Sequence, residues 1–541
     1  MSMDSTNTSH KRIPAMGMTG EEFLEAVRSS SVEIERYLSD VLARNVLPDV
    51  EPGYLRQRLP QSAPTHGESW QAIQSDMERA IMPGMTHWQH PKFMAFFPAT
   101  TSYPSMLGEL FSSALAAPAF NWICSPAVTE LETIVLDWFA QMLDLPPDFL
   151  SKGEGGGTIQ LSASDAIVTV MVVARERYIR RKLELEGFGG TDEEREDRCC
   201  ELRGKLVALG SEQSHISTKK ASVVAGTRFR TVRAPHADSY AMTGQALRHK
   251  LEELSAKGLH VYYLTVTLGT TNTCAVDEFQ EIAAVVKDYP DLWVHCDAAW
   301  AGAALILPEY QHLSKQMSFA NSFNVNMHKW LLTNFDASLL YVQRRKDLTD
   351  VLSLTPAYLR NSFSDSGLVI DYRDWRIPLG SRFRSLKIWF VIRAYGVEGL
   401  QAHVRKGIDL GDTFAQLIRS REDLFRLIAP PRFALTVFTV KPHTGSRPVL
   451  DVRLDGTPDA KPDPDRQTAS ADEHLQKANA VTKAVFELVQ RRGDFFLTSS
   501  VIADVYAIRV VSGNALADET FVREVFALLV SSTEEVLAKG A

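Results

Sequence analysis

Hydrophobic and polar positions follow two different periods along the middle of the chain. Apolar residues recur every three or four positions in segments 167–186 and 244–258, which predicts amphipathic helices. Short runs rich in β-branched residues at 205–210, 260–269 and 292–302 predict strands between the helices. Helices that alternate with strands in this way predict parallel strands joined by crossover helices, which is the α/β class of fold.

The two ends of the chain have other patterns. Residues 1–17 are polar and predict a disordered tail, whereas residues 18–105 predict a helical N-terminal segment. Residues 106–405 carry the α/β alternation, and residues 406–541 mix strands with helices, which predicts a small C-terminal α+β domain.

Two insertions interrupt this order, at 186–200 and 441–473. Both are rich in glycine, proline and charged residues, so we expect them to form solvated loops. No internal repeat is evident, which argues against a solenoid or a propeller.

Composition and charge narrow the class of protein. The 541 residues are 45% hydrophobic and 23% charged, as in a globular protein. A net charge of −8 argues against nucleic acid or an anionic membrane as the main partner. Five cysteines without a pairwise rhythm suggest neither a disulfide framework nor a metal site. No signal peptide or membrane-spanning run is apparent, so we expect a cytoplasmic protein.

A glycine-rich run, GEGGG at 153–157, precedes the small residues Ser162, Ala163 and Ser164. These residues stand where a helix is predicted to begin, and a helix N-terminus offers free N–H groups that suit a phosphate. The run does not match the dinucleotide or nucleotide-triphosphate motifs. Taken alone, the run is better explained as a flexible turn followed by a serine N-cap at Ser162 or Ser164.

Three further residues could carry chemistry. Asp297 ends an apolar strand, where a buried carboxylate needs a cationic or hydrogen-bonding partner. His215 follows the strand at 205–210, and Lys329 follows the alternating run FNVNM. Each has an ordinary structural explanation, as a turn cap, a surface histidine or a surface charge.

The order of these features predicts a pyridoxal 5'-phosphate site. The phosphate would lie at Ser162 to Ser164, and the ring would stack on His215. Asp297 would keep the ring nitrogen protonated, which makes the ring an electron sink. Lys329 would bind the cofactor covalently through a Schiff base, since a lysine becomes a nucleophile once its pKa is lowered.

Longer stretches resemble a known family. The segments HPKFMAFFPATTSYPSMLGELF, LGTTNTCAVDEF, HCDAAWAG, NMHKWLLTNFDAS and RIPLGSRFRSLKIWF resemble the aromatic-L-amino-acid decarboxylases, which are group II pyridoxal-phosphate enzymes. The resemblance covers residues 18–440 closely and the rest more loosely. It implies the aspartate-aminotransferase-like fold type I, and a homodimer whose N-terminal helices embrace the partner and whose active site lies at the subunit interface.

The resemblance also implies roles for individual residues. Asn326 and His328 would help to bind the phosphate, and Thr271 and Ala299 would contact the ring beside His215 and Asp297. An aromatic substrate would pack against a wall that comes partly from the neighbouring subunit. The residues matching this wall are Trp88, Phe96, Phe97, Pro98 and Phe120.

Residues 351–372 resemble the family's mobile catalytic loop. Tyr358 would protonate the carbanion that remains after CO2 leaves, with His215 assisting. Relatives that form aldehydes by coupled oxidative deamination commonly have phenylalanine at this position. Tyr358 therefore favours simple decarboxylation over an aldehyde synthase, and the retained lysine, aspartate and tyrosine disfavour a catalytically silent homologue.

The substrate pocket departs from the family at several positions. Gly380 aligns with a position that is glycine in plant relatives with indolic substrates, so tryptophan is favoured, with phenylalanine, tyrosine, DOPA and 5-hydroxytryptophan as alternatives. Ala99 replaces a threonine near the substrate carboxylate, and Thr100 could compensate. Met327 replaces a proline, and Ser381 replaces an arginine.

Overall fold

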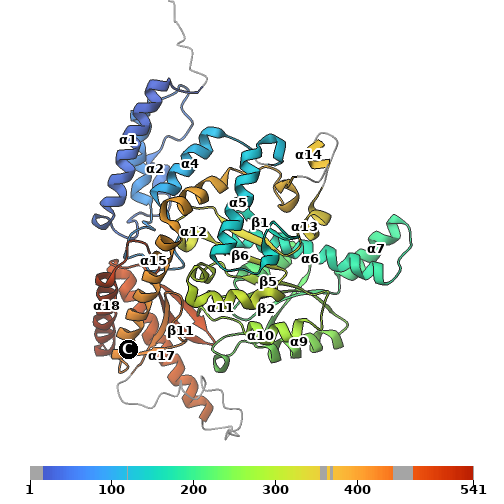
Figure 1. Ribbon diagram of the computed structural model, residues 1–541. Coiled ribbons are helices and arrows are strands. Elements are labelled where there is room, and N and C mark those ends of the chain that lie inside the picture. The colour runs from blue at the N-terminus through green and yellow to red at the C-terminus, as the bar shows by residue number, and fades with distance from the viewer. Residues whose placement is uncertain (1–15, 119, 354–361, 366–368, 443–466, 540–541) are drawn as a thin grey trace, which may run out of the picture. The chain divides into compact units, whose positions relative to one another are not determined.

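A computed structural model of the chain describes residues 16–118, 120–353, 362–365, 369–442 and 467–539 (Figure 1). The chain divides into two compact units, one up to His90 and one from Pro91 onward. The domain limits drawn from the sequence stay predictions.

The first unit is helical, as its periodicity predicts. The N-cap Thr19 and Glu22 form a capping box that satisfies two N–H groups at the start of its longest helix. The helices are α1 (Gly20–Ser39), α2 (Tyr54–Arg58) and α3 (Trp70–Asp76), followed by short π and 3-10 turns at Met77–Ile81 and Met82–Gly84.

A seven-stranded sheet forms the centre of the second unit. Its order is β1-β7-β6-β5-β4-β2-β3. The strands from β3 to β6 are parallel to one another, and β7 runs antiparallel to both of its neighbours. Their bounds are β1 (Gly156–Gln160), β2 (Leu206–Ser211), β3 (Arg228–Val232), β4 (His260–Thr267), β5 (Trp293–Asp297), β6 (Ser322–Asn326) and β7 (Ser338–Val342).

Helices cover both faces of this sheet. One face packs against α6 (Ala163–Leu185), which contacts five strands from β1 to β4 across the sheet. The opposite face contributes to the core that includes α5, α9 and α10. The helices of this lobe are α4 (Tyr103–Leu115), α5 (Pro126–Met142), α7 (Asp192–Arg203), α8 (Ile216–Val224), α9 (Gly244–Ala256), α10 (Phe279–Val286), α11 (Gln311–Ser314), α12 (Met327–Trp330), α13 (Arg345–Leu352) and α14 (Ser362–Asp365).

A smaller antiparallel sheet follows, in the order β10-β11-β9-β8. The long helix α15 leads into it and is kinked at Gly396, whose φ of 64° is non-helical. The elements are α15 (Arg384–Ser420), β8 (Phe425–Leu427), β9 (Leu435–Val440), α17 (Gln467–Arg492), β10 (Thr498–Ile502), β11 (Val505–Val511) and α18 (Glu519–Ala538).

The predicted α/β fold with a small C-terminal α+β part is therefore confirmed, and two local predictions are wrong. The insertion 186–200 is not a loop throughout, because α7 begins in it. Thr191 and Glu194 form a capping box there, a signal that charge content alone conceals. The glycine-rich run 153–157 is not a loop throughout either, because its last two glycines, Gly156 and Gly157, belong to β1. The tail 1–15 and most of the insertion 441–473 lie outside the described residues, and α17 begins within the latter.

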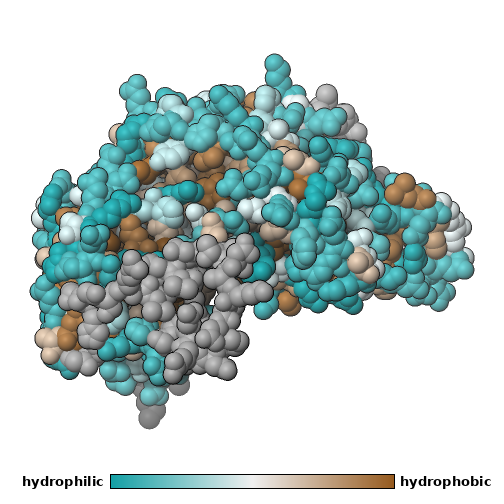
Figure 2. Space-filling model, turned by 90° about the horizontal axis from the view of Figure 1, so that it is seen from below, coloured by the Kyte–Doolittle hydropathy of each residue, from teal (hydrophilic) through white to brown (hydrophobic). Residues whose placement is uncertain are grey.

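Hydrophilic residues cover most of the face seen in Figure 2, with hydrophobic residues scattered among them. None of the helices that the structure describes combines the length and the apolar character of a membrane span. All five cysteines are free thiols.

Candidate active site

Polar side chains occupy one face of three adjacent parallel strands. The register pairs Thr267 of β4 with Asp297 of β5, and Asp297 with Asn324 of β6. Successive strand residues point to opposite faces, so these three side chains share the face that packs against α6. Asn326, two positions further along β6, shares it too and leads into α12. The carboxyl ends of parallel strands are where ligands bind in open α/β sheets.

Lys329 projects from α12 into this region. Among the described residues, none makes a hydrogen bond or an ion pair with its Nζ, which lies 5.6 Å from the centre of the Phe97 ring. Burial lowers the pKa of Lys329, and the charges of Asp297 and Cys274 act in the opposite direction. A lysine amine with a lowered pKa and no partner is poised as a nucleophile.

Asp297 is 5% exposed and accepts a hydrogen bond from the Ala299 N–H at 3.1 Å. No ion pair compensates this carboxylate within the described part of the chain. A buried carboxylate without a cation is costly, so the site is suited to a cationic group that comes from outside the chain.

His215 joins this group from the start of α8. Its Nδ1 accepts a hydrogen bond from the Ser217 N–H at 3.3 Å and lies 2.8 Å from the Ser217 hydroxyl. Burial lowers the pKa of His215, the Asp297 carboxylate raises it and Lys329 lowers it further. The charges of Asp297 and Lys329 therefore act on His215, and the cofactor roles of these three residues stay predictions.

The N-terminus of α6 supplies the predicted anion site. The Ser162 hydroxyl caps the helix by accepting from the Asp165 N–H at 3.2 Å, so the ordinary capping interpretation is right for this serine. The N–H groups of Ala163 and Ser164 belong to the first turn, which has no intrahelical partners for them. The 23-residue helix adds the positive end of its dipole.

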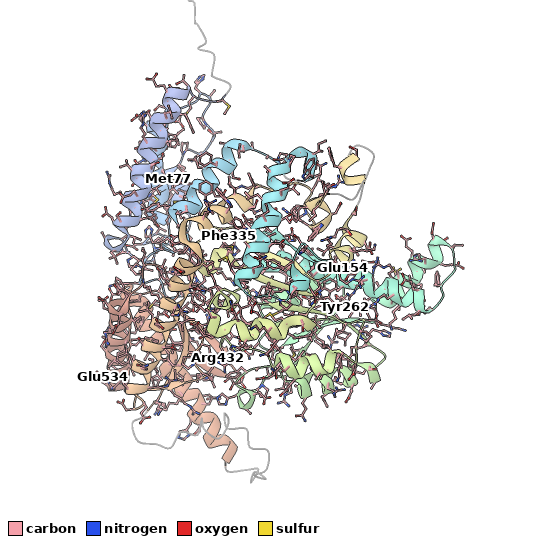
Figure 3. The ribbon with its side chains drawn as sticks, in the orientation of Figure 1. Met77, Glu154, Tyr262, Phe335, Arg432 and Glu534 are labelled. Carbon is pink, nitrogen blue, oxygen red and sulfur yellow. The ribbon has the colours of Figure 1, made fainter. Side chains whose placement is uncertain are left out.

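His328 is fixed within α12. Its Nδ1 accepts from the Ala337 N–H at 2.8 Å, and its ring lies 4.1 Å from that of Phe335, which is labelled in Figure 3. Burial and the neighbouring Lys329 lower the pKa of His328 to about 3, so the ring is neutral. Met327 donates its N–H to the Ala337 carbonyl at 3.0 Å, a bond that a proline could not make.

Several buried polar atoms near these residues have no partner among the described residues, and two of them lie next to α12. They are the Asn326 Oδ1 and the Thr100 Oγ1. Asn326 donates its backbone N–H to the Ala299 carbonyl at 3.2 Å, and Thr100 donates its own to the His328 carbonyl at 3.0 Å. Unpartnered buried groups are costly, and they are typical of a site that a ligand completes.

Aromatic rings form one wall of the site. Phe97 stacks on Trp300 at 4.5 Å, and Trp300 stacks on Trp330 at 4.2 Å. Pro98 is buried beside them, whereas Phe96 is 47% exposed and meets Phe496 edge to face. The wall next to Lys329 is thus apolar, and its role in substrate binding stays a prediction.

Other predicted wall residues lie elsewhere. The Phe120 carbonyl accepts a hydrogen bond from the Arg373 N–H, and Gly380 lies in an exposed hollow beside the end of α4. The contacts that define the Lys329 group include neither residue. Trp88 belongs to the first unit, and Tyr358 lies outside the described residues.

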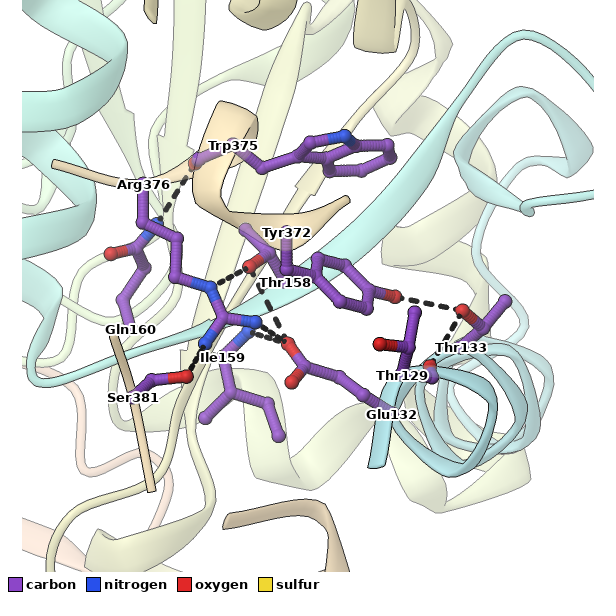
Figure 4. Close-up of polar contacts among 10 residues, drawn as sticks. All are labelled: Thr129, Glu132, Thr133, Thr158, Ile159, Gln160, Tyr372, Trp375, Arg376 and Ser381. Carbon is purple, nitrogen blue, oxygen red and sulfur yellow. Dashed lines mark hydrogen bonds and ion pairs between the residues drawn. The ribbon is translucent and has the colours of Figure 1, made fainter. Parts of the chain in front are cut away.

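The segment that carries Gly380 is anchored by a buried ion pair. Arg376 pairs with Glu132 of α5, donates to Thr158 Oγ1 of β1 at 3.0 Å and donates to the Ser381 hydroxyl at 2.6 Å (Figure 4). The serine that replaces the family's arginine therefore accepts a hydrogen bond from this cluster.

Arg509 was missed by the sequence interpretation. It lies on β11, is 5% exposed, and donates to the Thr271 carbonyl at 2.6 Å and to Thr498 Oγ1 at 3.1 Å. Its guanidinium lies 5.5 Å from the centre of the Phe97 ring, and the Lys329 Nζ lies 5.6 Å from the same centre. In the sequence, the signal that could have identified Arg509 is that it is a single arginine within an otherwise apolar strand.

These residues fit pyridoxal 5'-phosphate. They offer a lysine amine without a partner, a carboxylate without a cation, and a helix N-terminus with free N–H groups. No group of three or more His, Cys, Asp or Glu side chains among the described residues could hold a metal ion.

Comparison with known proteins decides the family. The profile of the "Pyridoxal-dependent decarboxylase conserved domain" matches residues 52–441, and an aromatic-L-amino-acid decarboxylase of Cavia porcellus is 44% identical over 78% of this chain and 86% of its own. The chain belongs to the aromatic-L-amino-acid decarboxylase family. It is therefore a carboxy-lyase that uses pyridoxal 5'-phosphate.

Relatives of this decarboxylase carry different names. Tyrosine decarboxylase 2 of Narcissus pseudonarcissus is 37% identical over 96% of both chains. The structure of Oryza sativa TDC with PLP and tryptamine has a TM-score of 0.85 at 32% identity, over 96% of this chain and 99% of that one. The 4-hydroxyphenylacetaldehyde synthase of Rhodiola rosea has a TM-score of 0.81 at 31% identity, with the same coverage. The fold is thus that of fold-type I decarboxylases, and the names differ in substrate and product.

Proposed function

We propose that this decarboxylase converts an aromatic L-amino acid, with tryptophan favoured, to the arylalkylamine and CO2. The observation that carries the proposal is the unpartnered Lys329 amine, held between the Phe97 wall and the uncompensated Asp297. Bound pyridoxal 5'-phosphate supplies an electron sink for the pair left when the Cα–carboxylate bond breaks.

The residues on the polar face would hold the cofactor. Lys329 would bind it covalently, and Asp297 would keep a proton on the ring nitrogen. The N–H groups of Ala163 and Ser164, with Ser162, Asn326 and His328, would bind the phosphate at the start of α6. His215 would stack on the ring, and Thr271 and Ala299 would contact its edge and face.

Two residues would move protons. Tyr358 would deliver a proton to the substrate Cα after CO2 leaves, and His215 would assist. The lowered pKa of His215 supports this role, because a neutral imidazole near neutral pH can both accept and donate a proton. The part of the loop that carries Tyr358 lies outside the described residues, and the water-excluding role that the sequence suggests for it stays a prediction.

An aromatic side chain suits the apolar wall of Phe97 and Trp300. The buried Thr100 hydroxyl supports a contact to the substrate carboxylate in place of the family threonine at position 99. Gly380 favours an indole because it adds no side chain to the pocket. The mixed names of the relatives leave tyrosine, phenylalanine, DOPA and 5-hydroxytryptophan as alternatives.

The decarboxylase would act as a homodimer. Leu107, Leu110, Phe111 and Leu115 recur on one face of α4 and are 46–60% exposed. The other face of α4 packs against α15 so closely that a Cβ on Gly108 would come within 2.5 Å of the Lys387 Cα. A second copy that covers the exposed face could bring Phe120 and Gly380 to the site. A monomer at micromolar concentration in light scattering would contradict this part.

The proposed reaction can be tested with the holoenzyme and each aromatic amino acid, by measuring amine, aldehyde and peroxide. Amine without peroxide, fastest with tryptophan, is the expected result. Aldehyde with peroxide would identify an aldehyde synthase, and no product would identify a silent homologue. A Tyr358→Phe variant sharpens the test, because it should lose amine formation and gain peroxide. The expected cytoplasmic location stays a prediction.

A further inference from the structure

A second row of polar side chains lies directly below Asp297. The register pairs Thr265 of β4 with His295 of β5, and His295 with Ser322 of β6. His295, Ser322 and Asn324 are fully buried. Polar residues here are unexpected, because strands covered on both faces are ordinarily almost continuously apolar.

The hydrogen bonds of this row have a fixed direction. The Trp293 indole, which can only donate, gives its N–H to Ser322 Oγ at 2.8 Å. Asn324 Oδ1 can only accept, so its contact of 2.8 Å with His295 Nε2 places the ring hydrogen on Nε2. Nδ1 of the neutral ring is then an acceptor and takes the hydrogen of the Ser322 hydroxyl, also at 2.8 Å.

His295 is neutral in this setting. Burial lowers the pKa of His295 to about 4, although Asp297 and the bond to Asn324 favour the charged form. Tyr263 of β4 stacks on its ring at 6.3 Å, and from α6 the Arg177 guanidinium lies over the Trp293 ring below. Because the His295 imidazole is neutral, it supplies no positive charge to compensate the Asp297 carboxylate in the next row.

The two neighbours of Asp297 in its own row carry unused donors. Asn324 Oδ1 is occupied by His295, which leaves Nδ2 at the level of Asp297. Asn324 Nδ2 and Thr267 Oγ1 are both buried, and neither has a partner among the described residues. An unmade buried hydrogen bond is costly, so two of them on either side of one carboxylate indicate a functional constraint.

We propose that His295 is a positioning residue for Asp297, acting through Asn324. The relay from Trp293 to His295 fixes the Asn324 amide, whose Nδ2 flanks the Asp297 carboxylate on one side while the Thr267 hydroxyl flanks it on the other. Neither donor bonds to Asp297 in the structure; with the cofactor bound, both would be placed to hydrogen bond to the carboxylate and hold it where the ring nitrogen meets it. The inference rests on the proposed roles of Asp297 and the cofactor. It extends them to the neighbouring row of side chains on the same face of the sheet.

Two substitutions of His295 separate hydrogen bonding from bulk. His295→Gln can still accept from Ser322 and donate to Asn324, whereas His295→Phe can do neither. The readouts are the dissociation constant of pyridoxal phosphate, from titration of the apoenzyme, and the pH dependence of the bound cofactor's absorption. We expect His295→Phe to weaken binding about tenfold, as expected when a buried bond is lost, and His295→Gln to stay within about twofold of wild type.

A matched control comes from the small sheet. Thr482 is equally buried, bonds to Thr439 Oγ1 at 2.8 Å and to the Val440 N–H at 3.0 Å, and lies away from the cofactor residues. Thr482→Val should lower the unfolding temperature and leave the dissociation constant unchanged. Unchanged binding and absorption in His295→Phe would overturn the inference, and so would equal losses in His295→Phe and His295→Gln.

If His295→Phe does not fold, Thr267→Val tests the same idea with a nearly isosteric change. Removal of an unpartnered hydroxyl should keep or raise the unfolding temperature of the apoenzyme and yet weaken cofactor binding. Unchanged cofactor binding in this variant would overturn the inference. Failure of the wild-type protein to bind pyridoxal phosphate would instead overturn the proposed function, so the two failures are distinguishable.

Discussion

The two faces of the large sheet are built from the same strands and differ in character toward the carboxyl ends of those strands. On β4, β5 and β6 the face toward α6 carries polar residues beyond the aromatic Tyr263 and Trp293, whereas the opposite face carries apolar ones. The polar set is Thr265, Thr267, His295, Asp297, Ser322, Asn324 and Asn326, and the apolar set is Leu264, Val266, Val294, Cys296, Phe323 and Val325.

This difference shows how the protein combines stability with chemistry in one element. Side chains alternate with period two along a strand, so a one-residue slip would move every polar group into the apolar core. The apolar face holds the register by packing against α9 and α10. The polar face can then hold partly unsatisfied groups, such as Asp297, Asn324 and Thr267, that would not stabilise a fold by themselves.

The largest effect should come from Lys329, at the end of the polar face. Lys329→Ala removes the amine that is predicted to bind the cofactor, so amine production should fall at least about a thousandfold. Amine production is measured by chromatography of the products of the holoenzyme. Activity close to wild type would break the link between the polar face and catalysis.

Asp297→Asn should have the next largest effect. The amide keeps the shape of the side chain and loses the charge, so turnover should fall about a hundredfold or more, as when other electrostatic groups in active sites are removed. The side chain of the adjacent Cys296 points to the other face, so Cys296→Ala serves as the control. A loss of turnover per folded molecule in Cys296→Ala equal to that in Asp297→Asn would contradict the contrast between the faces.

Val294→Ala tests the apolar face directly. It removes two buried methyl groups, and we expect the free energy of unfolding to fall by about 2 kcal/mol. Denaturant unfolding of the apoenzyme measures this change. The dissociation constant of pyridoxal phosphate should stay within about twofold of wild type, because no polar group changes. A large loss of cofactor affinity with little loss of stability would reverse the assignment of the two faces.

A smaller effect is expected in the pH dependence of stability. The folded pKa of His295, about 4, lies below the ordinary histidine value of about 6.5, so the unfolded chain binds this proton first. The stabilisation is complete above about pH 6.5 and is lost as the pH falls toward 4, at about 1.4 kcal/mol per pH unit. His295→Gln has no such proton.

The measurement is the unfolding midpoint of the two apoenzymes between pH 7 and pH 4.5. The midpoint of His295→Gln should fall less steeply with acid than that of wild type. Identical pH dependence would show that His295 is protonated as easily in the folded protein as in the unfolded chain.

Much of the fold and the site could be predicted from the sequence because both depend on local patterns. Helical and strand periods predicted the α/β order, and the spacing of His215, Asp297 and Lys329 relative to strand ends predicted that they meet. The helix α7 was missed because its charge outweighed the capping signal at Thr191.

Long-range contacts could not be predicted in this way. Arg509 reaches Thr271 across 238 positions, and nothing near either residue indicates the other. The unpartnered donors of Thr267 and Asn324 became visible only once the strand register was known. The predicted positions of Phe120 and Gly380 in the pocket depend on the proposed homodimer.

The most direct test asks which lysine carries the cofactor. The holoenzyme is treated with borohydride, digested, and its cofactor-labelled peptide is identified by mass spectrometry. Lys387 is the built-in comparison, since it is 1% exposed but is held by Glu109 at 2.6 Å. The label is expected on Lys329 alone, on α12 beside the polar face of the sheet. A label on Lys387, or on any other lysine in place of Lys329, would contradict it.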